Sequence, residues 1–420
     1  MELNLLIHRV DEVEEGPRTE LEGTTLRVDV QELRRHLLED RRLVDVRVEI
    51  ASPHSPSRTG SVFDILEPRA KEPGSGSDFP GLLGPMSIAG HGSTHVLSGS
   101  AVTVVDPLTD PGAMARVLEL GGEASARTPY GNLWHVILVP VVSPAATDSA
   151  ARNAVRLASV KAAVYLGRVG IGLGPGRTET FALGGPNSAH SGLPRIAFIG
   201  QVLAHHRYIE QEEPILYGSS TRGFLPTVLH PNEWIDGAVV CSYRNLGVET
   251  YFHQNHPIVA DLLLRHRAGD LIFVGTVATA SASLEADRQR SSALAAHLSK
   301  DILEADAAIL TSYGGGAPHA DMGETASLCE SLGVRTSVLV AEMAGDRRVE
   351  SANIFAYPEV DAAIVIGGGD TSWSLKPVER LIAATPEHVN ALATLESLNA
   401  GSLPGVTNQQ GASRIRAFTY

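Results

Sequence analysis

The chain is poor in cysteine and in basic residues, and it contains no long hydrophobic run. Its 420 residues include two cysteines, Cys241 and Cys329, which are too few for a disulfide framework. Lys and Arg number 34 against 48 Asp and Glu, so the formal net charge is −14. Nucleic acids and anionic membranes are bound by clustered Lys and Arg, and this charge argues against both partners. No apolar run approaches the roughly 20 residues that cross a bilayer.

The first residues, MELNLLIHRVDEVEEG, carry acidic side chains where a secretory signal would carry a basic region and a longer apolar core. Together with the low cysteine content, this predicts a reduced, cytoplasmic protein. The hydrophobic share of 43% and the charged share of 20% are typical of a globular protein. A chain of 420 residues is long enough for two or three domains, each with its own core.

The first part of the chain has the pattern of a β-rich region with an ordered loop rich in Pro and Gly. One predicted strand, 133–142, contains Pro140, which favours an edge position or a bend. A helical pattern at 147–166 opens an α/β middle region, whose His205 and His206 we expect to be exposed near a turn. We therefore predict three parts, at 1–145, 146–240 and 241–420.

The last part alternates apolar, β-branched runs with helical patterns. Such alternation predicts a parallel sheet with helices on both faces, so the fold class is α/β with a β-rich N-terminal region. The expected strands are 271–277, 307–311, 335–341 and 361–366, and the expected helices are 284–303, 321–332 and 376–384.

One stretch, 235–280, joins the two halves and concentrates reactive side chains. A short apolar run, 238–241, is predicted to be a buried strand and ends at the rare thiol of Cys241, with Ser242 next to it. The cluster His253, Asn255 and His256 follows. A histidine can act as an acid or a base near neutral pH. Alternatively, these side chains hold the turn before the next helix by hydrogen bonding.

A second group of candidates lies where the predicted parallel strands end, because ligands bind at the carboxyl ends of such strands. Glycines let a backbone approach a ligand closely, and a helix N-terminus favours an anion such as a carboxylate. Alternatively, the glycines only make tight turns. The candidate substrate-binding residues here are Gly314, Gly315, Gly316, His319, Asp321, Glu342, Gly368 and Asp370.

Neither glycine run has the G-x-G-x-x-G spacing of a dinucleotide site, and no P-loop lysine follows. We therefore expect no nucleotide cofactor. His91 and His95 have the i, i+4 spacing of metal ligands on a helix, but their segment has the composition of a loop. We expect no metal site, and we expect Cys329 to be a small buried hydrophobe.

Several motifs, in the same order along nearly the whole chain, resemble the component B proprotein of glycine/sarcosine/betaine reductase and its D-proline reductase relative. They are FPGLLG (79–84), GSTHVLSGSAVTVVD (92–106), LPTVLHPNEWIDGA (225–238), TYFHQNHPIVADLLLRHRAGDLIFVG (250–275) and GGGAPHAD (314–321). His95 matches this family pattern and His91 does not, which makes His95 a further substrate-binding candidate.

The resemblance implies internal cleavage and a pyruvoyl group. In that family a thiol or hydroxyl attacks the carbonyl that precedes it, and the residue after the cut becomes a pyruvoyl group, an electrophile toward a substrate amine. Here the precursor would be Cys241 or Ser242, with His253 and His256 as the other catalytic candidates. This chain has a shorter segment between its DGA and TYFH motifs than the family, so an uncleaved chain is the third alternative.

The resemblance further implies a cytoplasmic subunit of a reductase complex that cleaves the C–N bond of a small amino acid or N-substituted amine. Its partner would be a second B-type subunit containing selenocysteine or cysteine. Two alternatives stay open. The chain could be a descendant without pyruvoyl that catalyses another C–N or C–S transformation, or a non-catalytic scaffold subunit.

Overall fold

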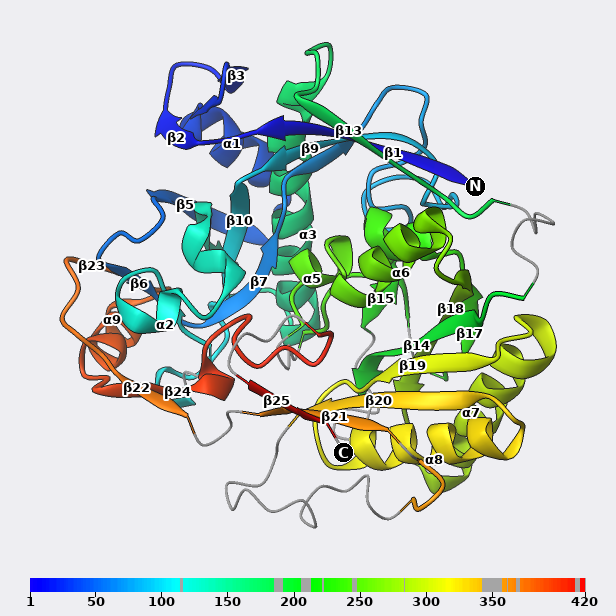
Figure 1. Ribbon diagram of the computed structural model, residues 1–420. Coiled ribbons are helices and arrows are strands. Elements are labelled where there is room, and N and C mark those ends of the chain that lie inside the picture. The colour runs from blue at the N-terminus through cyan, green and yellow to red at the C-terminus, as the bar shows by residue number, and fades with distance from the viewer. Residues whose placement is uncertain are drawn as a thin grey trace.

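The computed structural model describes most of the chain and shows two sheet regions joined by a buried connection (Figure 1). The described residues are 1–113, 116–184, 192–204, 213–220, 223–243, 248–282, 284–341, 357–360, 362–367, 371–411 and 416–419. Among them, no helix has the length and apolar character to cross a membrane.

The N-terminal region is built from two four-stranded sheets with the orders β13-β1-β9-β8 and β5-β12-β10-β7. This confirms that the region is rich in β-structure. The strands are β1 (Glu2–Arg9), β5 (Leu43–Ala51), β7 (Val62–Leu66), β8 (Arg69–Lys71), β9 (Gly92–Ser98), β10 (Ser100–Val105), β12 (Trp134–Val142) and β13 (Arg177–Ala182). A smaller sheet contains β2 (Glu12–Glu15), β4 (Thr25–Val28) and β3 (Glu20–Glu22).

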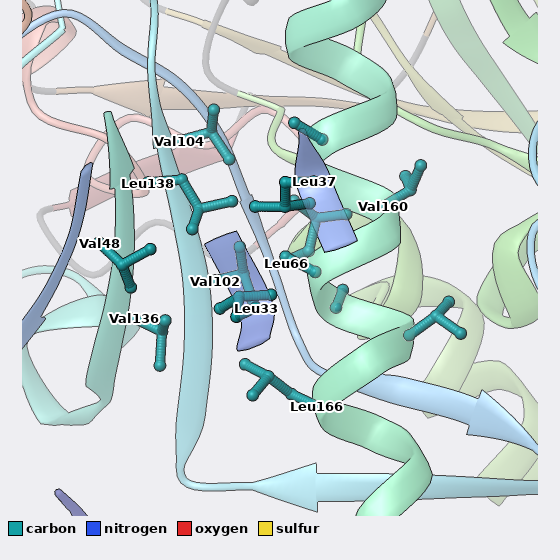
Figure 2. Close-up of a cluster of buried hydrophobic side chains, with 14 of the residues drawn as sticks. Leu33, Leu37, Val48, Leu66, Val102, Val104, Val136, Leu138, Val160 and Leu166 are labelled. Atoms are coloured by element: carbon teal, nitrogen blue, oxygen red, sulfur yellow. The ribbon is translucent and has the colours of Figure 1, made fainter. Parts of the chain in front are cut away.

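Two helices cover these strands and form the first hydrophobic core. Helix α1 (Val30–Leu37) begins after Asp29, which caps it by accepting a hydrogen bond from the Glu32 backbone N–H. Helix α3 (Asp148–Gly167) begins after Thr147, which accepts from the Ala150 N–H. Apolar side chains of α1, α3 and the second sheet meet in one cluster (Figure 2). Burial of this shared apolar surface fixes α3 against the strands.

The C-terminal region is a seven-stranded sheet with the order β17-β18-β14-β19-β20-β21-β25. The five inner strands are parallel, and the two outer ones are antiparallel to their neighbours. The strands are β14 (Arg195–Ala204), β17 (Thr227–Leu229), β18 (Ile272–Ser281), β19 (Ala307–Thr311), β20 (Arg335–Ala341), β21 (Ala363–Gly367) and β25 (Arg416–Thr419).

Helices cover both faces of this sheet, as predicted. Helix α6 (Pro257–Ala268) packs on one face, where Leu262 shares a core with Phe198 of β14. Helices α7 (Glu285–His297) and α8 (Ala317–Ser331) pack on the other, where Met322 shares a core with Ile199. Neighbouring residues of β14 thus enter different cores, because side chains alternate across a strand.

The remaining elements complete the chain between and after the two large sheets. Helices are α2 (Gly122–Ser125), α4 (Pro231–Glu233), α5 (Thr250–Gln254) and α9 (Pro386–Ala393). Strands are β6 (Ser57–Thr59), β11 (Leu118–Glu119), β15 (Pro214–Leu216), β16 (Ser219–Ser220), β22 (Ser372–Ser374), β23 (Arg380–Ile382) and β24 (Ser397–Asn399). Helix α3 packs on the N-terminal strands while β14 lies in the C-terminal sheet, so the predicted middle region contributes to both, and the three-part division stays a prediction.

Three local predictions were wrong. The helix expected at 376–384 is instead β23, which pairs with β6, so a partner distant in sequence overrides local helical pattern. The strand containing Pro140 is central, since β12 lies between β5 and β10. Its pairing with β10 ends at Leu138, however, so Pro140 faces only β5 and interrupts no ladder on the other side. The run 238–241 is buried, but it makes only one bridge, between Val239 and Leu216.

Candidate functional site

Cys241 lies in a buried polar cluster between the two sheet regions. Its backbone N–H donates to Thr250 Oγ1 at 3.0 Å, and that hydroxyl donates to Asp64 Oδ2 at 2.7 Å. The Thr250 backbone N–H donates to Asp64 Oδ1 at 2.8 Å. Asp64 comes from the middle of β7, and its carboxyl group acts electrostatically on the Cys241 thiol. A thiol, a carboxyl group and a hydroxyl thus meet at the peptide bond that follows Val240.

Burial controls the protonation of this group. It raises the pKa of the Asp64 carboxyl, against the lowering effect of the hydrogen bonds from Thr250. Burial also raises the pKa of the Cys241 thiol well above its usual range, and the charge of Asp64 adds to that shift. The thiol is therefore neutral at rest. Asp64 is placed to accept its proton, and an acceptor of raised pKa is better matched to that task.

Two arginines flank Cys241, and the charge of each acts to lower the thiol pKa. Arg116 pairs with the buried carboxylate of Glu249, which also accepts a hydrogen bond from Tyr130 Oη at 2.7 Å. Arg156, from α3, is fully buried and lies over two aromatic rings. We call Cys241, Asp64, Thr250, Arg116 and Arg156 the Cys241 cluster.

Ser242 faces the opposite way from Cys241. Its Oγ lies 2.6 Å from Tyr313 Oη, in the loop after β19. The two candidate precursor residues are adjacent in sequence, but Cys241 contacts the N-terminal region and Ser242 contacts the C-terminal sheet. Among the contacts of the described residues, the Cys241 thiol is the one influenced by a carboxyl group, that of Asp64.

The loop after β19 is held by three glutamines. Gln201 accepts from the Tyr313 backbone N–H at 2.9 Å, and Gln409 accepts from the Gly314 N–H at 2.8 Å. Gln410 accepts from Thr311 Oγ1 at 2.9 Å. We call Gln201, Gln409 and Gln410 the glutamine network. It uses the backbone N–H groups of Tyr313 and Gly314, which precede α8, and Gly314 and Gly316 adopt the positive φ of a turn, at 89° and 75°.

The structure places His319 and Asp321 inside α8, which begins at Ala317 and not at Asp321 as expected. Burial lowers the pKa of His319 to about 4. Asp321 accepts a hydrogen bond from Ser281 and lies 3.1 Å from Arg288 Nε. Burial raises the pKa of its carboxyl to about 6. Gly315 and Gly316 are partly or fully exposed. Glu342, Gly368, Asp370, His205 and His206 lie outside the described residues.

His253 and His256 are buried among aromatic rings. Trp234 Nε1 donates to His253 Nδ1 at 3.2 Å, and His256 Nε2 lies 2.9 Å from Gln410 Oε1. Burial lowers the pKa of His253 to about 3 and that of His256 to about 4, so both rings are neutral at pH 7. His256 also caps α6 by accepting from the Val259 N–H. The hydrogen bonds described for these two rings thus go to Trp234, Gln410 and the backbone of α6.

Asn255 and His95 have structural partners. Asn255 Oδ1 accepts from Arg69 at 2.9 Å, and its amide donates to Glu67 at 3.2 Å, which ties the start of α6 to the segment before β8. His95, in β9, bonds to His8 at 2.9 Å and to Glu72. Within the described residues no group of three or more His, Cys, Asp or Glu is arranged to hold a metal ion.

Sequence reasoning missed Asp64, Arg116 and Arg156. Asp64 interrupts the apolar run VFDIL of β7, and Arg156 lies within the mostly buried helix α3. A charged residue inside an apolar stretch is a signal that could have found both. A cavity of about 490 Å³ lies elsewhere, between 119–124 and 372–378, and none of its lining residues belongs to the Cys241 cluster.

Comparisons with known proteins agree with the resemblance. The sequence model of the family described as glycine/sarcosine/betaine reductase component B subunits matches residues 1–408. The sarcosine reductase complex component B subunit alpha of Peptoclostridium acidaminophilum is 29% identical over 89% of this chain and 87% of its own length. The glycine reductase complex component B subunits alpha and beta of Acetoanaerobium sticklandii are 27% identical over 98% of each chain. The betaine reductase complex component B subunit alpha of P. acidaminophilum is 28% identical over 96% and 90%. No solved structure matches the chain.

Proposed function

The chain belongs to the family of glycine/sarcosine/betaine reductase component B subunits, and from this we propose that it acts in a reductase complex through a pyruvoyl group made from Cys241. The substrate would be a small amino acid or N-substituted amine, and the reaction reductive cleavage of its C–N bond. The names of the relatives support this class of substrate and a multi-subunit complex. The partner would be a B-type subunit containing selenocysteine or cysteine.

The observation that carries the proposal is the position of the buried Asp64 carboxyl group, which Thr250 links to Cys241 by accepting from the Cys241 N–H and donating to Asp64. In the first step Sγ attacks the carbonyl carbon of Val240, and Asp64 takes the thiol proton. The peptide C–N bond then breaks, its nitrogen takes up a proton, and a thioester joins Val240 to the side chain of residue 241. Thr250 orients both partners, since it bonds to the Cys241 N–H and to Asp64.

The second step is an elimination. The Cα proton of residue 241 is removed and its Cβ–S bond breaks, so the upstream chain ends as a thiocarboxylate and the downstream chain begins as dehydroalanine. Water then replaces the terminal nitrogen, which leaves as ammonia, and a ketone remains. When present, this group supplies an electrophilic carbonyl that withdraws electrons from an attached amine. Ser242 is the weaker precursor, because its hydroxyl bonds to the phenol of Tyr313, and a neutral phenol is a poorer proton acceptor than a carboxylate.

The test is intact-mass spectrometry of the purified protein with and without phenylhydrazine. We expect two fragments that meet before Cys241, with the downstream one gaining a hydrazone. Cys241→Ala should leave one unmodified chain, and Ser242→Ala should still be cleaved. Fragments that meet before Ser242 would instead establish the serine precursor.

A single wild-type chain without hydrazone would contradict the pyruvoyl function. Turnover by such a chain alone would then favour a descendant with other C–N or C–S chemistry. An inert chain that a complex nevertheless requires would favour a scaffold.

A further inference from the structure

Four buried cationic side chains lie in the described part of the chain, and they differ in what neutralises them. Three are paired with a carboxylate: Arg58 with Glu119, Arg69 with Glu67, and Lys71 with Asp236. Arg156 is the fourth and is 0% exposed. None of its three guanidinium nitrogens has a hydrogen-bond partner among the described residues, and no ion pair joins it to a carboxylate there.

The surroundings of Arg156 satisfy it only in part. Its guanidinium carbon lies 4.6 Å from the centre of the Tyr243 ring and 5.4 Å from that of Phe63. Ring faces attract a cation, but they accept none of the N–H groups in the guanidinium plane. The nearby carboxyl groups are engaged elsewhere, since Asp64 accepts from Thr250 and Glu213 accepts from the Tyr243 N–H. A buried charge without hydrogen bonds is costly, so proteins keep one only where it serves a purpose.

Arg156 is next to the position that becomes reactive. Its guanidinium lies over the rings of Phe63, the neighbour of Asp64 in the chain, and of Tyr243, two residues after Cys241, and these rings share one core with Cys241. Its charge acts on the Cys241 thiol and on Asp64. In an α-amino acid the amino nitrogen and the carboxylate are attached to one carbon. A substrate whose nitrogen reaches residue 241 therefore carries its carboxylate into the surroundings of that residue. A planar guanidinium can bind a carboxylate through two parallel hydrogen bonds.

We propose that Arg156 binds the carboxylate of the substrate, so that the site selects α-amino acids over amines that lack a carboxylate. The inference rests on the pyruvoyl function proposed above. It also moves the anion site away from the loop after β19, whose donors the glutamine network already uses.

The test uses the purified, cleaved protein with three probes: glycine, its neutral amide glycinamide, and methylamine. Each probe is added with cyanoborohydride, which reduces the bond formed between an amine and a ketone, and the mass gain of the downstream fragment is followed against concentration. We expect glycine to reach half-saturation at a concentration at least about 30-fold lower than glycinamide, because pairing with a buried charge strengthens binding on this scale.

Two variants assign the preference to Arg156. Arg156→Gln should react with glycine and glycinamide alike, and Arg156→Lys should restore part of the preference, since it keeps the charge but not the planar fork. Arg58→Gln is the matched control, because it removes another buried arginine, one that is paired with Glu119, and it should keep the full preference. The phenylhydrazine reaction of each variant shows separately whether its carbonyl has formed.

The outcomes separate this inference from the proposed function. A hydrazone in wild type, with an unchanged glycine preference in Arg156→Gln, would overturn the assignment of Arg156 and leave the pyruvoyl function intact. No hydrazone in wild type would overturn both. If neither Arg156 variant is cleaved, the test uses wild type and Arg58→Gln alone. Equal reaction of glycine and glycinamide with these two proteins would overturn the inference, and a strong preference for glycine would support it.

Discussion

The Cys241 cluster and the glutamine network lie side by side, joined by the contact between Ser242 and Tyr313, yet they hold different chemistry. The glutamine network is neutral, and its amide oxygens accept from backbone N–H groups and hydroxyls. The Cys241 cluster is charged, and one of its charges, Arg156, has no polar partner among the described residues. Both regions are buried, so burial alone does not explain why one is neutral and the other is charged. Gln410 Nε2 also has no hydrogen-bond partner among the described residues, but an amide left unbonded costs less than a buried charge, so the charge is the stronger indication of a site.

The largest expected effect comes from the carboxyl group of the Cys241 cluster. Asp64→Asn keeps the shape and the hydrogen bond to the Thr250 N–H but cannot take the thiol proton. We expect cleavage to slow by about 100- to 10,000-fold, the usual contribution of a general base. The rate is measured on denaturing gels after a pulse of cell-free synthesis. Asp321→Asn, the same change at a buried carboxyl group of α8 outside the Cys241 cluster, should be cleaved at the wild-type rate. Equal slowing by both variants would show that the effect is not specific to the cluster.

The next largest effect is the contribution of each region to the free energy of unfolding. It is measured by urea unfolding in a Cys241→Ala background, in which the chain is expected to stay uncleaved. Gln410→Leu should lower the free energy of unfolding by about 1–3 kcal/mol, because His256 and Thr311 lose their buried acceptor. Arg156→Met should leave it unchanged or raise it by about 1 kcal/mol or more, because an unpaired buried charge is removed. A loss at Arg156 as large as that at Gln410 would show that the guanidinium is structural.

The smallest effect concerns the dependence of stability on pH at Asp321. Its carboxyl pKa is raised from 3.8 to about 6 in the folded chain. The folded state therefore binds this proton more tightly than the unfolded state. The resulting stability is fully present below pH 3.8 and is lost as the pH rises through about 6. After allowance for solvent screening we expect about 1 kcal/mol. Asp321→Asn cannot ionise, so its unfolding curves between pH 4 and 7 should lack this step.

Much of the C-terminal sheet could be predicted, because its strands are continuous apolar runs enclosed by turn-forming residues. Strands β19 and β20 have the predicted bounds, and α3 (148–167) matches the helix predicted at 147–166 to within one residue at each end. Strand β23 could not be predicted, since its pairing with β6 is a contact between residues distant in sequence. The same holds for the central position of β12.

The site was predictable only in part, for the same reason. Cys241 attracts attention as one of two cysteines, and its neighbourhood in the sequence suggested His253 and His256 as its partners. The structure supplies Asp64 instead, which meets Thr250 across 186 residues of chain. The histidines are turned into the aromatic core around Trp234. Proximity in sequence therefore pointed to histidines, whereas the hydrogen bonds described at Cys241 lead to Thr250 and Asp64.

Strand β14 precedes Cys241 in the chain, but in the sheet it lies between β18 and β19, both of which follow Cys241. A cut at Cys241 would therefore divide the polypeptide without dividing the sheet. To leave one another, the two fragments would have to open the centre of the sheet and expose both of its cores. Dissociation and unfolding would be one event, and fragments would not exchange between molecules. Processing would give two polypeptides that remain one folding unit.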